Sequence, residues 1–265
     1  MNRSVLIVSL ARCGSSAIYE FVKQSLGKDC EGFFEPNYES FLKHTIPALD
    51  QGKNVCVKVL LRPFLQFNTN FEERFTQVVG LVRDPRDNLI SRLLFRMVSP
   101  AFIENKKVYD VLLPLFEQKL DDPNSISVCK LFRQMEKTGL MEPMIDQRVE
   151  ENLSFFINWH AKSLDPIIYK YEKFIQEQYD EIFCVTNQKR SISKSEIQTV
   201  YPQIKRAGKI GDWRHWFTSE DIDFFRPRFE EYMTVYNYCD DWNLQNNQFI
   251  SAETSIDYIR KYARL

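Results

Sequence analysis

The sequence contains no run of about 20 apolar residues, the length that a membrane-spanning helix needs. Its first apolar segment begins at Ser4 and leaves no room for a signal peptide, so we expect a cytoplasmic protein. It also lacks a basic excess, because 35 Lys and Arg residues are balanced by 36 Asp and Glu residues. Since nucleic-acid-binding domains usually carry such an excess, we expect no nucleic-acid partner and no membrane span.

Cysteine is also sparse, with six residues in a chain of 265, no CxxC pair and no neighbouring pair of histidines. This spacing excludes a disulfide scaffold and shows no metal-ligand pattern, so we expect no bound metal. Cys56 and Cys184 lie within apolar runs, where a thiol usually packs as a small hydrophobic group. Cys13 lies in a glycine-containing turn, and with no base nearby in the sequence we expect it to pack too.

Short apolar runs alternate with amphipathic stretches along the chain, a pattern typical of a parallel α/β sheet. The expected strands are Val5–Leu10, Val55–Leu60, Val78–Val82 and Glu181–Val185. Each is five or six residues long and rich in Val, Leu or Ile, as strands covered on both faces tend to be. Residues 15–26 have helical spacing. We therefore expect an α/β fold with a parallel sheet between two layers of helices.

The region 100–147 has a different pattern, with four prolines between amphipathic helical patches. It predicts a helical insertion or lid on the sheet. Residues 150–178 then predict a long helical segment that breaks near Asp165-Pro166. No repeat, low-complexity tract or flexible linker separates these parts, so we expect one domain over residues 1–265.

The segment VLIVSLARCGSSAI, residues 5–18, is an apolar strand that runs into a turn of small residues and then a helix. This layout directs backbone N–H groups at an anionic ligand. The turn is not a Walker A sequence, which needs G-x-x-x-x-G-K-[ST], because the first glycine and the lysine are both absent. The segment therefore predicts a site for a phosphate-like group and argues against ATP bound with Mg²⁺.

Two later segments also carry arginines. In RDPRDNLIS, Arg83 ends an apolar strand and Ser91 lies about two turns into a helix that begins near the proline. We expect Asp87, in the same segment, to cap or brace a loop rather than touch a ligand. The segment RAGKIGDW is a glycine-containing loop with Arg206 and Lys209. Taken singly, each segment is equally typical of a solvated surface.

Together the three segments resemble the sulfotransferases that use 3′-phosphoadenosine 5′-phosphosulfate (PAPS). That family's phosphosulfate loop commonly reads PKSGTTW or PRSGTTL, where this chain has ARCGSSAI. Its R-(N/D)-P-(R/K)-D-x-x-x-S motif matches RDPRDNLIS throughout, and its R-K-G-x-x-G-D-W motif matches RAGKIGDW except at Ala207. The segments occur in the family's order and span nearly the whole chain.

This resemblance implies a P-loop-like fold and a sulfotransferase activity. The sulfuryl group of PAPS would pass to a hydroxyl or amine of a small-molecule or carbohydrate acceptor, without a metal, leaving 3′,5′-adenosine bisphosphate (PAP). Arg12 would stabilise the charge that develops on the oxygen bridging phosphate and sulfate. The residues implied to hold the 5′ end are Arg12, Cys13, Gly14, Ser15, Ser16 and Ala17. Those implied to hold the 3′-phosphate are Arg83, Ser91 and Arg206, with Gly208 and Lys209 from the late loop.

A general base is needed to take the proton of the acceptor hydroxyl. Some members of the family use the histidine of a K-T-H segment, but the segment VCVKVLLRPF here keeps Lys58 and has Leu60 in place of the histidine. Other members use a glutamate soon after the first helix, which points to Glu35 in EGFFEPNYESF. A carboxylate beside two phenylalanines is expected to be partly desolvated and so a stronger base, although it is also suited to bracing a loop. Lys58 either steadies the sulfuryl group or only ends a strand.

Three departures from the family pattern keep other functions open. Ala17 replaces a tryptophan that stacks on adenine in many members, and Ala207 removes a cation. The family's YED segment corresponds here to CVTNQ, around Thr186 and Asn187. One alternative is therefore a nucleotide-binding protein that has lost turnover. The other is a P-loop kinase-like phosphotransferase, which would need Mg²⁺ and a lysine in the loop.

Overall fold

The computed structural model describes residues 2–67, 71–186 and 208–265. They form two compact units. The first contains residues of the ranges 1–83 and 155–202, and the second contains residues of the ranges 84–154 and 203–265. The expectation of one domain over residues 1–265 stays a prediction.

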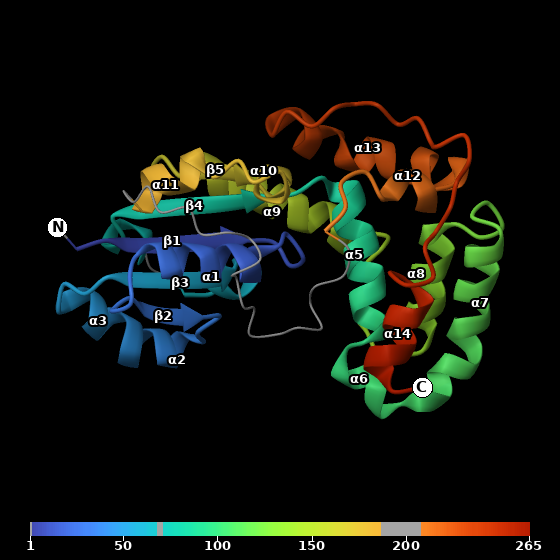
Figure 1. Ribbon diagram of the computed structural model, residues 1–265, viewed down its shortest axis with the longest axis horizontal. Helices are drawn as coiled ribbons and strands as arrows, with labels where there is room; N and C mark the ends of the chain where they lie inside the picture. The colour runs from blue at the N-terminus through green and yellow to red at the C-terminus, as the bar shows by residue number, and fades with distance from the viewer. Residues whose placement is uncertain (1, 68–70, 187–207) are drawn as a thin grey trace. The chain divides into compact units, whose positions relative to one another are not determined.

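A parallel five-stranded sheet forms the centre of the first unit, with the strand order β2-β3-β1-β4-β5 (Figure 1). The strands are β1 (Ser4–Ser9), β2 (Glu31–Phe34), β3 (Val55–Leu60), β4 (Gln77–Val82) and β5 (Ile167–Lys170). Residues 5–8 of β1 are fully buried, since β1 lies between β3 and β4 and helices cover both faces. This burial explains why the inner strands are unbroken apolar runs rather than alternating ones.

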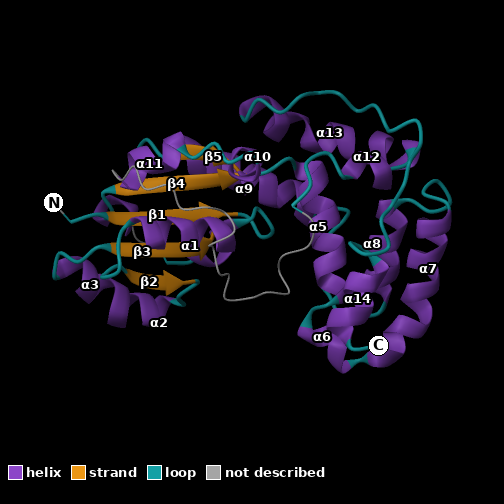
Figure 2. Ribbon diagram, in the orientation of Figure 1, coloured by secondary structure: helices purple, strands orange, loops and turns teal. Residues whose placement is uncertain are grey.

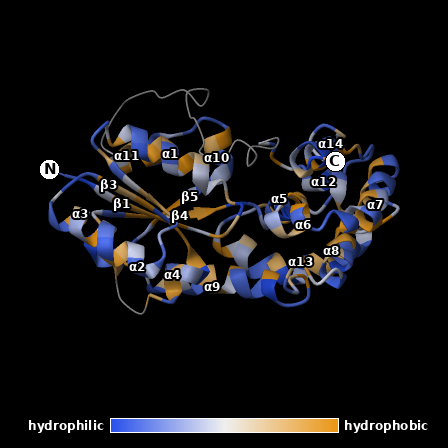
Figure 3. Cartoon of the chain, turned by 90° about the horizontal axis from the view of Figure 1, so that it is seen from below, coloured by the Kyte–Doolittle hydropathy of each residue, from blue (hydrophilic) through white to orange (hydrophobic). Residues whose placement is uncertain are grey.

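Helices cover both faces of this sheet, and its apolar strands lie between them (Figures 2 and 3). One layer contains α1 (Ser15–Ser25), α10 (Tyr171–Ile175) and α11 (Asp180–Thr186). The other contains α2 (Tyr38–Ser40), α3 (Ile46–Asp50), α4 (Leu61–Leu65) and the part of α9 (Arg148–Lys162) that belongs to this unit. The predicted α/β fold with a parallel sheet and flanking helices is confirmed.

The second unit is helical in its described residues. Besides the first residues of α9, its helices are α5 (Pro85–Met97), α6 (Pro100–Glu104), α7 (Tyr109–Asp121), α8 (Val128–Lys137), α12 (Trp213–Trp216), α13 (Ser219–Val235) and α14 (Ile256–Ala263). The helical character predicted for 100–147 is therefore confirmed, and its role as a lid stays a prediction. None of the helices in the described ranges is long and apolar enough to cross a membrane.

One buried carboxylate joins two helix starts in this second unit. The oxygens of Asp221, which is fully buried, accept the N–H groups of Val128 and Cys129 at the start of α8, each at 2.9 Å. They also accept the N–H of Thr218, the N-cap of α13, at 2.9 Å. Because the first N–H groups of a helix have no partner inside it, this carboxylate satisfies donors that would otherwise be buried without a bond.

Two predicted elements were wrong. Residues 181–185, expected to be a strand, lie in α11, because a five-residue apolar run fits a buried helix as well as a strand. The strand that lies beside β4 is β5, inside the segment that we expected to be helical. The predicted break at Asp165-Pro166 is correct, but a strand follows it. The four-residue strand β2 was not predicted at all.

Candidate active site

The turn after β1 gives the first unit an anion-binding shape. Arg12 and Gly14 both have left-handed backbone conformations, with φ angles of 70° and 75°. Gly14 is the N-cap of α1, and its carbonyl accepts the N–H groups of Ala17 and Ile18. The turn therefore aims the N-terminus of an eleven-residue helix at the carboxyl end of β1. Cys13 is 1% exposed and packs in the interior, as expected.

Tyr171 lies directly against this turn. A Cβ atom at position 14 would be 2.2 Å from Cδ2 and Cε2 of the Tyr171 ring, so only glycine fits there. Tyr171 is the first residue of α10 and follows β5 without a gap. Sequence reasoning missed this residue because it expected a helix there and placed the YED counterpart near residue 186. Thr186 in fact ends α11, Asn187 lies outside the described residues, and a Tyr-Glu pair follows β5 at 171–172.

Arg83 follows β4 and completes the cluster around the turn. Its Nη1 donates a hydrogen bond of 3.0 Å to the carbonyl oxygen of Arg12, and its guanidinium carbon is 4.6 Å from the centre of the Tyr171 ring. The residue is 6% exposed, and its buried Nε has no hydrogen-bond partner among the described residues. A buried N–H group without a partner is costly, and an anionic ligand would supply the missing acceptor.

Glu35 and Lys58 form an ion pair at the neighbouring strand ends. Lys58 pairs with Phe34 in the register of β2 and β3, and Glu35 comes next in the chain. The Lys58 ammonium contacts the Glu35 carboxylate, and the Glu35 N–H donates to the Lys58 carbonyl oxygen at 2.7 Å. Glu35 has a left-handed backbone with a φ angle of 47°. The expected desolvation of Glu35 is wrong, because its side chain is 38% exposed and its charge is paired.

Burial dominates the electrostatics of Lys58, whose side chain is 2% exposed. Burial lowers the pKa of Lys58 below its ordinary value, the nearby charge of Arg12 lowers it further, and Glu35 acts in the opposite direction. Arg12 therefore lies within electrostatic range of Lys58. The first unit thus brings together Arg12, Glu35 and Lys58, the three residues to which the sequence assigned chemistry.

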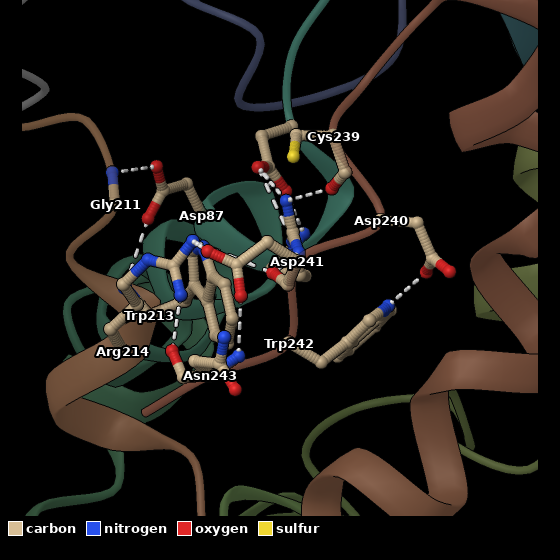
Figure 4. Close-up of polar contacts among 11 residues, drawn as sticks. Asp87, Gly211, Trp213, Arg214, Cys239, Asp240, Asp241, Trp242 and Asn243 are labelled. Carbon is tan, nitrogen blue, oxygen red and sulfur yellow. Dashed lines mark hydrogen bonds and ion pairs between the residues drawn. The ribbon is translucent and has the colours of Figure 1, made fainter. Parts of the chain in front are cut away.

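The second unit holds the remaining described candidates. Ser91 is buried in α5, Gly208 has a φ angle of 61°, and Lys209 is exposed. Asp87, one turn before Ser91, accepts the N–H groups of Gly211 and Trp213, so its predicted role as a loop brace is confirmed (Figure 4). Arg206 lies outside the described residues. In the described part of the chain, no group of three or more His, Cys, Asp or Glu side chains is placed to hold a metal ion.

The parallel sheet, with a glycine turn and a buried arginine at its carboxyl edge, defines a P-loop-like α/β protein. The sulfotransferase domain family matches residues 2–237, which extend over both units. The chain therefore belongs to the sulfotransferase family. Its fit to that family's sequence pattern is the finding that turns a generic anion site into a sulfotransferase site.

Solved structures show the same fold. Mouse sulfotransferase SULT7A1 complexed with PAP superimposes with a TM-score of 0.55 at 12% sequence identity, over 89% of each chain. Retinol dehydratase in complex with androsterone and inactive cofactor PAP gives a TM-score of 0.44 at 13% identity, over 87% of this chain and 80% of that one. No curated protein matches the chain.

Proposed function

We propose that this sulfotransferase moves the sulfuryl group of PAPS to a hydroxyl or amine of a small-molecule or carbohydrate acceptor. The observation that carries the proposal is the contact between Arg83 and the Arg12 carbonyl beside the glycine turn. It fixes the turn and leaves a buried guanidinium N–H without an acceptor among the described residues. An anion bound at this turn would meet both the helix N-terminus and that N–H.

The residues present fit the two anionic ends of PAPS. Backbone N–H groups at the start of α1, with the hydroxyls of Ser15 and Ser16, would hold the 5′-phosphate. The resemblance assigns the 3′-phosphate to Arg83 of the first unit and to Ser91 and the loop after Arg206 of the second. When bound, PAPS supplies the activated sulfuryl group. Selection for a 3′-phosphate would exclude ATP, which has none.

Arg12 would act on the charge of the departing group. Its backbone is held by the bond from Arg83 and by its own left-handed conformation, so the direction in which its side chain leaves the turn is restricted. A guanidinium placed at the bridging oxygen neutralises the negative charge that collects there as the S–O bond breaks. Such an interaction is stronger in the transition state than in the ground state, and therefore raises turnover.

Glu35 would take the proton of the acceptor as the acceptor oxygen or nitrogen attacks sulfur. The bond from sulfur to the acceptor forms while the bond from sulfur to the bridging oxygen breaks, and the electron pair stays on the phosphate. Lys58 orients the Glu35 carboxylate through their ion pair, and its position close to the turn suits it to the charge on the sulfuryl oxygens. The exposed side of Glu35 leaves access for an acceptor.

A transfer assay tests this proposal. The protein is incubated with PAPS labelled in its sulfuryl group and with separate pools of phenols, sterols, aliphatic alcohols, sugars and amines, in buffer that contains a chelator. We expect label in at least one pool, because the proposed chemistry uses no metal. Tight binding of PAP without transfer to any pool would instead support a nucleotide-binding protein that has lost turnover. Transfer of phosphate from ATP, dependent on Mg²⁺, would support the phosphotransferase alternative.

A further inference from the structure

Helix α5 holds the late glycine loop through one buried carboxylate. Asp87 is 1% exposed, and each of its oxygens accepts one backbone N–H of that loop. Oδ2 accepts from Gly211 at 2.7 Å and Oδ1 accepts from Trp213 at 3.0 Å (Figure 4). Because two bonds from one rigid carboxylate fix both position and orientation, the loop is anchored to α5 at this point.

The ring of Trp213 gives the loop a second anchor. The guanidinium carbon of Arg86 is 4.2 Å from the centre of this ring. Arg86 is itself fixed, because it donates to the carboxylate of Asp84 and to the carbonyl oxygens of Cys239 and Asp241. The loop therefore ends on a side chain that cannot easily shift, and Asp87 holds the backbone immediately before it (Figure 4).

Asp87 and Ser91 lie four residues apart in α5, so their side chains are neighbours on one face of the helix. The loop that Asp87 holds is therefore attached one helical turn from Ser91. Asp87 itself is unsuited to contact phosphate, because like charges repel and its two oxygens already accept N–H groups. Its position suits a supporting role beside a residue assigned to the 3′-phosphate.

We propose that Asp87 is a positioning residue that sets the preference for nucleotides with a 3′-phosphate. By anchoring the loop at Gly211 and Trp213, it keeps the stretch that begins at Gly208 beside Ser91, so that backbone N–H groups and the hydroxyl meet the same phosphate. This inference rests on the proposed use of PAPS. The turn that holds the 5′ end belongs to the other unit, so loss of the Asp87 carboxylate affects the 3′-phosphate selectively.

The test compares two nucleotides that differ only in the 3′-phosphate, PAP and adenosine 5′-monophosphate (AMP), by calorimetric titration of the full-length chain. In Asp87→Ala, the ratio of AMP Kd to PAP Kd falls by about tenfold or more, because bonds to a charged group are lost. The Kd for AMP itself stays within about twofold. Asp87→Asn keeps one acceptor oxygen and gives an intermediate ratio, and this isosteric variant carries the test if the alanine variant does not fold.

Asp240→Asn is the matched control. Asp240 belongs to the same network, but its carboxylate accepts the Trp242 indole N–H at 2.6 Å and pairs with Arg226, not with the loop. This variant keeps the wild-type ratio. Equal weakening of PAP and AMP in the Asp87 variants would overturn the inference and leave only a structural brace, and so would an unchanged ratio. A wild-type protein with no preference for PAP over AMP would overturn the proposed use of PAPS, and the inference with it.

Discussion

The ring of Tyr171 lies so close to Gly14 that a Cβ atom at position 14 would fall 2.2 Å from two ring carbons. This contact joins the turn after β1 to the first residue after β5. The same ring lies 4.6 Å from the guanidinium carbon of Arg83, which in turn bonds the Arg12 carbonyl. The proposed phosphate site therefore depends on a short relay of contacts across three strand ends of one sheet.

The Gly14→Ala substitution tests this contact. Gly139→Ala is the matched control, because Gly139 has a φ angle of 71° against 75° for Gly14, but a methyl group there would meet no atom of the described residues within 4 Å. Both variants lose about 1–2 kcal/mol of unfolding free energy from left-handed backbone strain. Gly14→Ala loses about 1–3 kcal/mol more through overpacking, as measured by urea unfolding. A second substitution, Tyr171→Ala, should recover part of that excess. Equal losses in the two single variants would contradict the contact.

The Glu35→Gln substitution removes the proposed base and keeps the size of the side chain. We expect turnover to fall by about 10²–10⁴-fold, with little change in PAP affinity, because the residue acts on the acceptor proton. The measurement is single-turnover transfer from labelled PAPS to the acceptor found in the assay above.

Glu31→Gln is the control for this substitution. Glu31 begins β2, the strand that Glu35 follows, and pairs with Lys53 at an exposed site. Exposed ion pairs contribute little, so turnover in this variant stays at the wild-type level. Undiminished transfer by Glu35→Gln would remove Glu35 as the base.

The Arg12→Ala substitution separates binding from catalysis. If Arg12 acts on the bridging oxygen, turnover falls by about 10²–10³-fold while the Kd for PAP changes by less than about threefold. Removal of the exposed cation of Arg74, which pairs with Asp50 in the same unit, changes neither quantity. Losses of equal size in turnover and affinity would make Arg12 a binding residue only.

Lys119 gives a pH-dependent contribution to stability. The residue is fully buried, it donates to the carbonyl oxygens of Pro123 and Ile126, and burial lowers its pKa from 10.5 to about 8. Between these two values the unfolded chain holds the proton more tightly, so unfolding free energy rises with pH across that window. Relative to Lys119→Met, the wild-type protein gains up to about 3 kcal/mol from pH 8 to pH 10.5. Lys137→Met, at an exposed position, shows no such difference.

The strands and helix that the sequence predicted well are those whose pattern is local. Residues 55–60 form β3 as expected, and Asp84 caps α5 just before its proline, as the Asp-Pro pair indicated. The strand β5 could not be distinguished from a helix, because four residues are too few to show a period. Residue types alone identified Arg12, Glu35 and Lys58, since each stands in or near a recognisable motif.

What the sequence could not supply were contacts between distant segments. The closeness of Tyr171 to Gly14 depends on β5 lying beside β4, which no local pattern encodes. The ion pair of Glu35 with Lys58 depends on the register of β2 against β3, so its effect on the exposure of Glu35 was not foreseen. Asp87 was recognised as a brace, but the loop that it holds emerges only from the fold.

Thermal unfolding with two nucleotides tests the central claim, that the site takes a nucleotide with a 3′-phosphate and needs no metal. PAP, added with a chelator at about a hundredfold excess over its Kd, should raise Tm by about 5 °C. ATP with Mg²⁺ at the same concentration should shift Tm by less than about 1 °C. A larger shift from ATP with Mg²⁺ than from PAP would contradict the account.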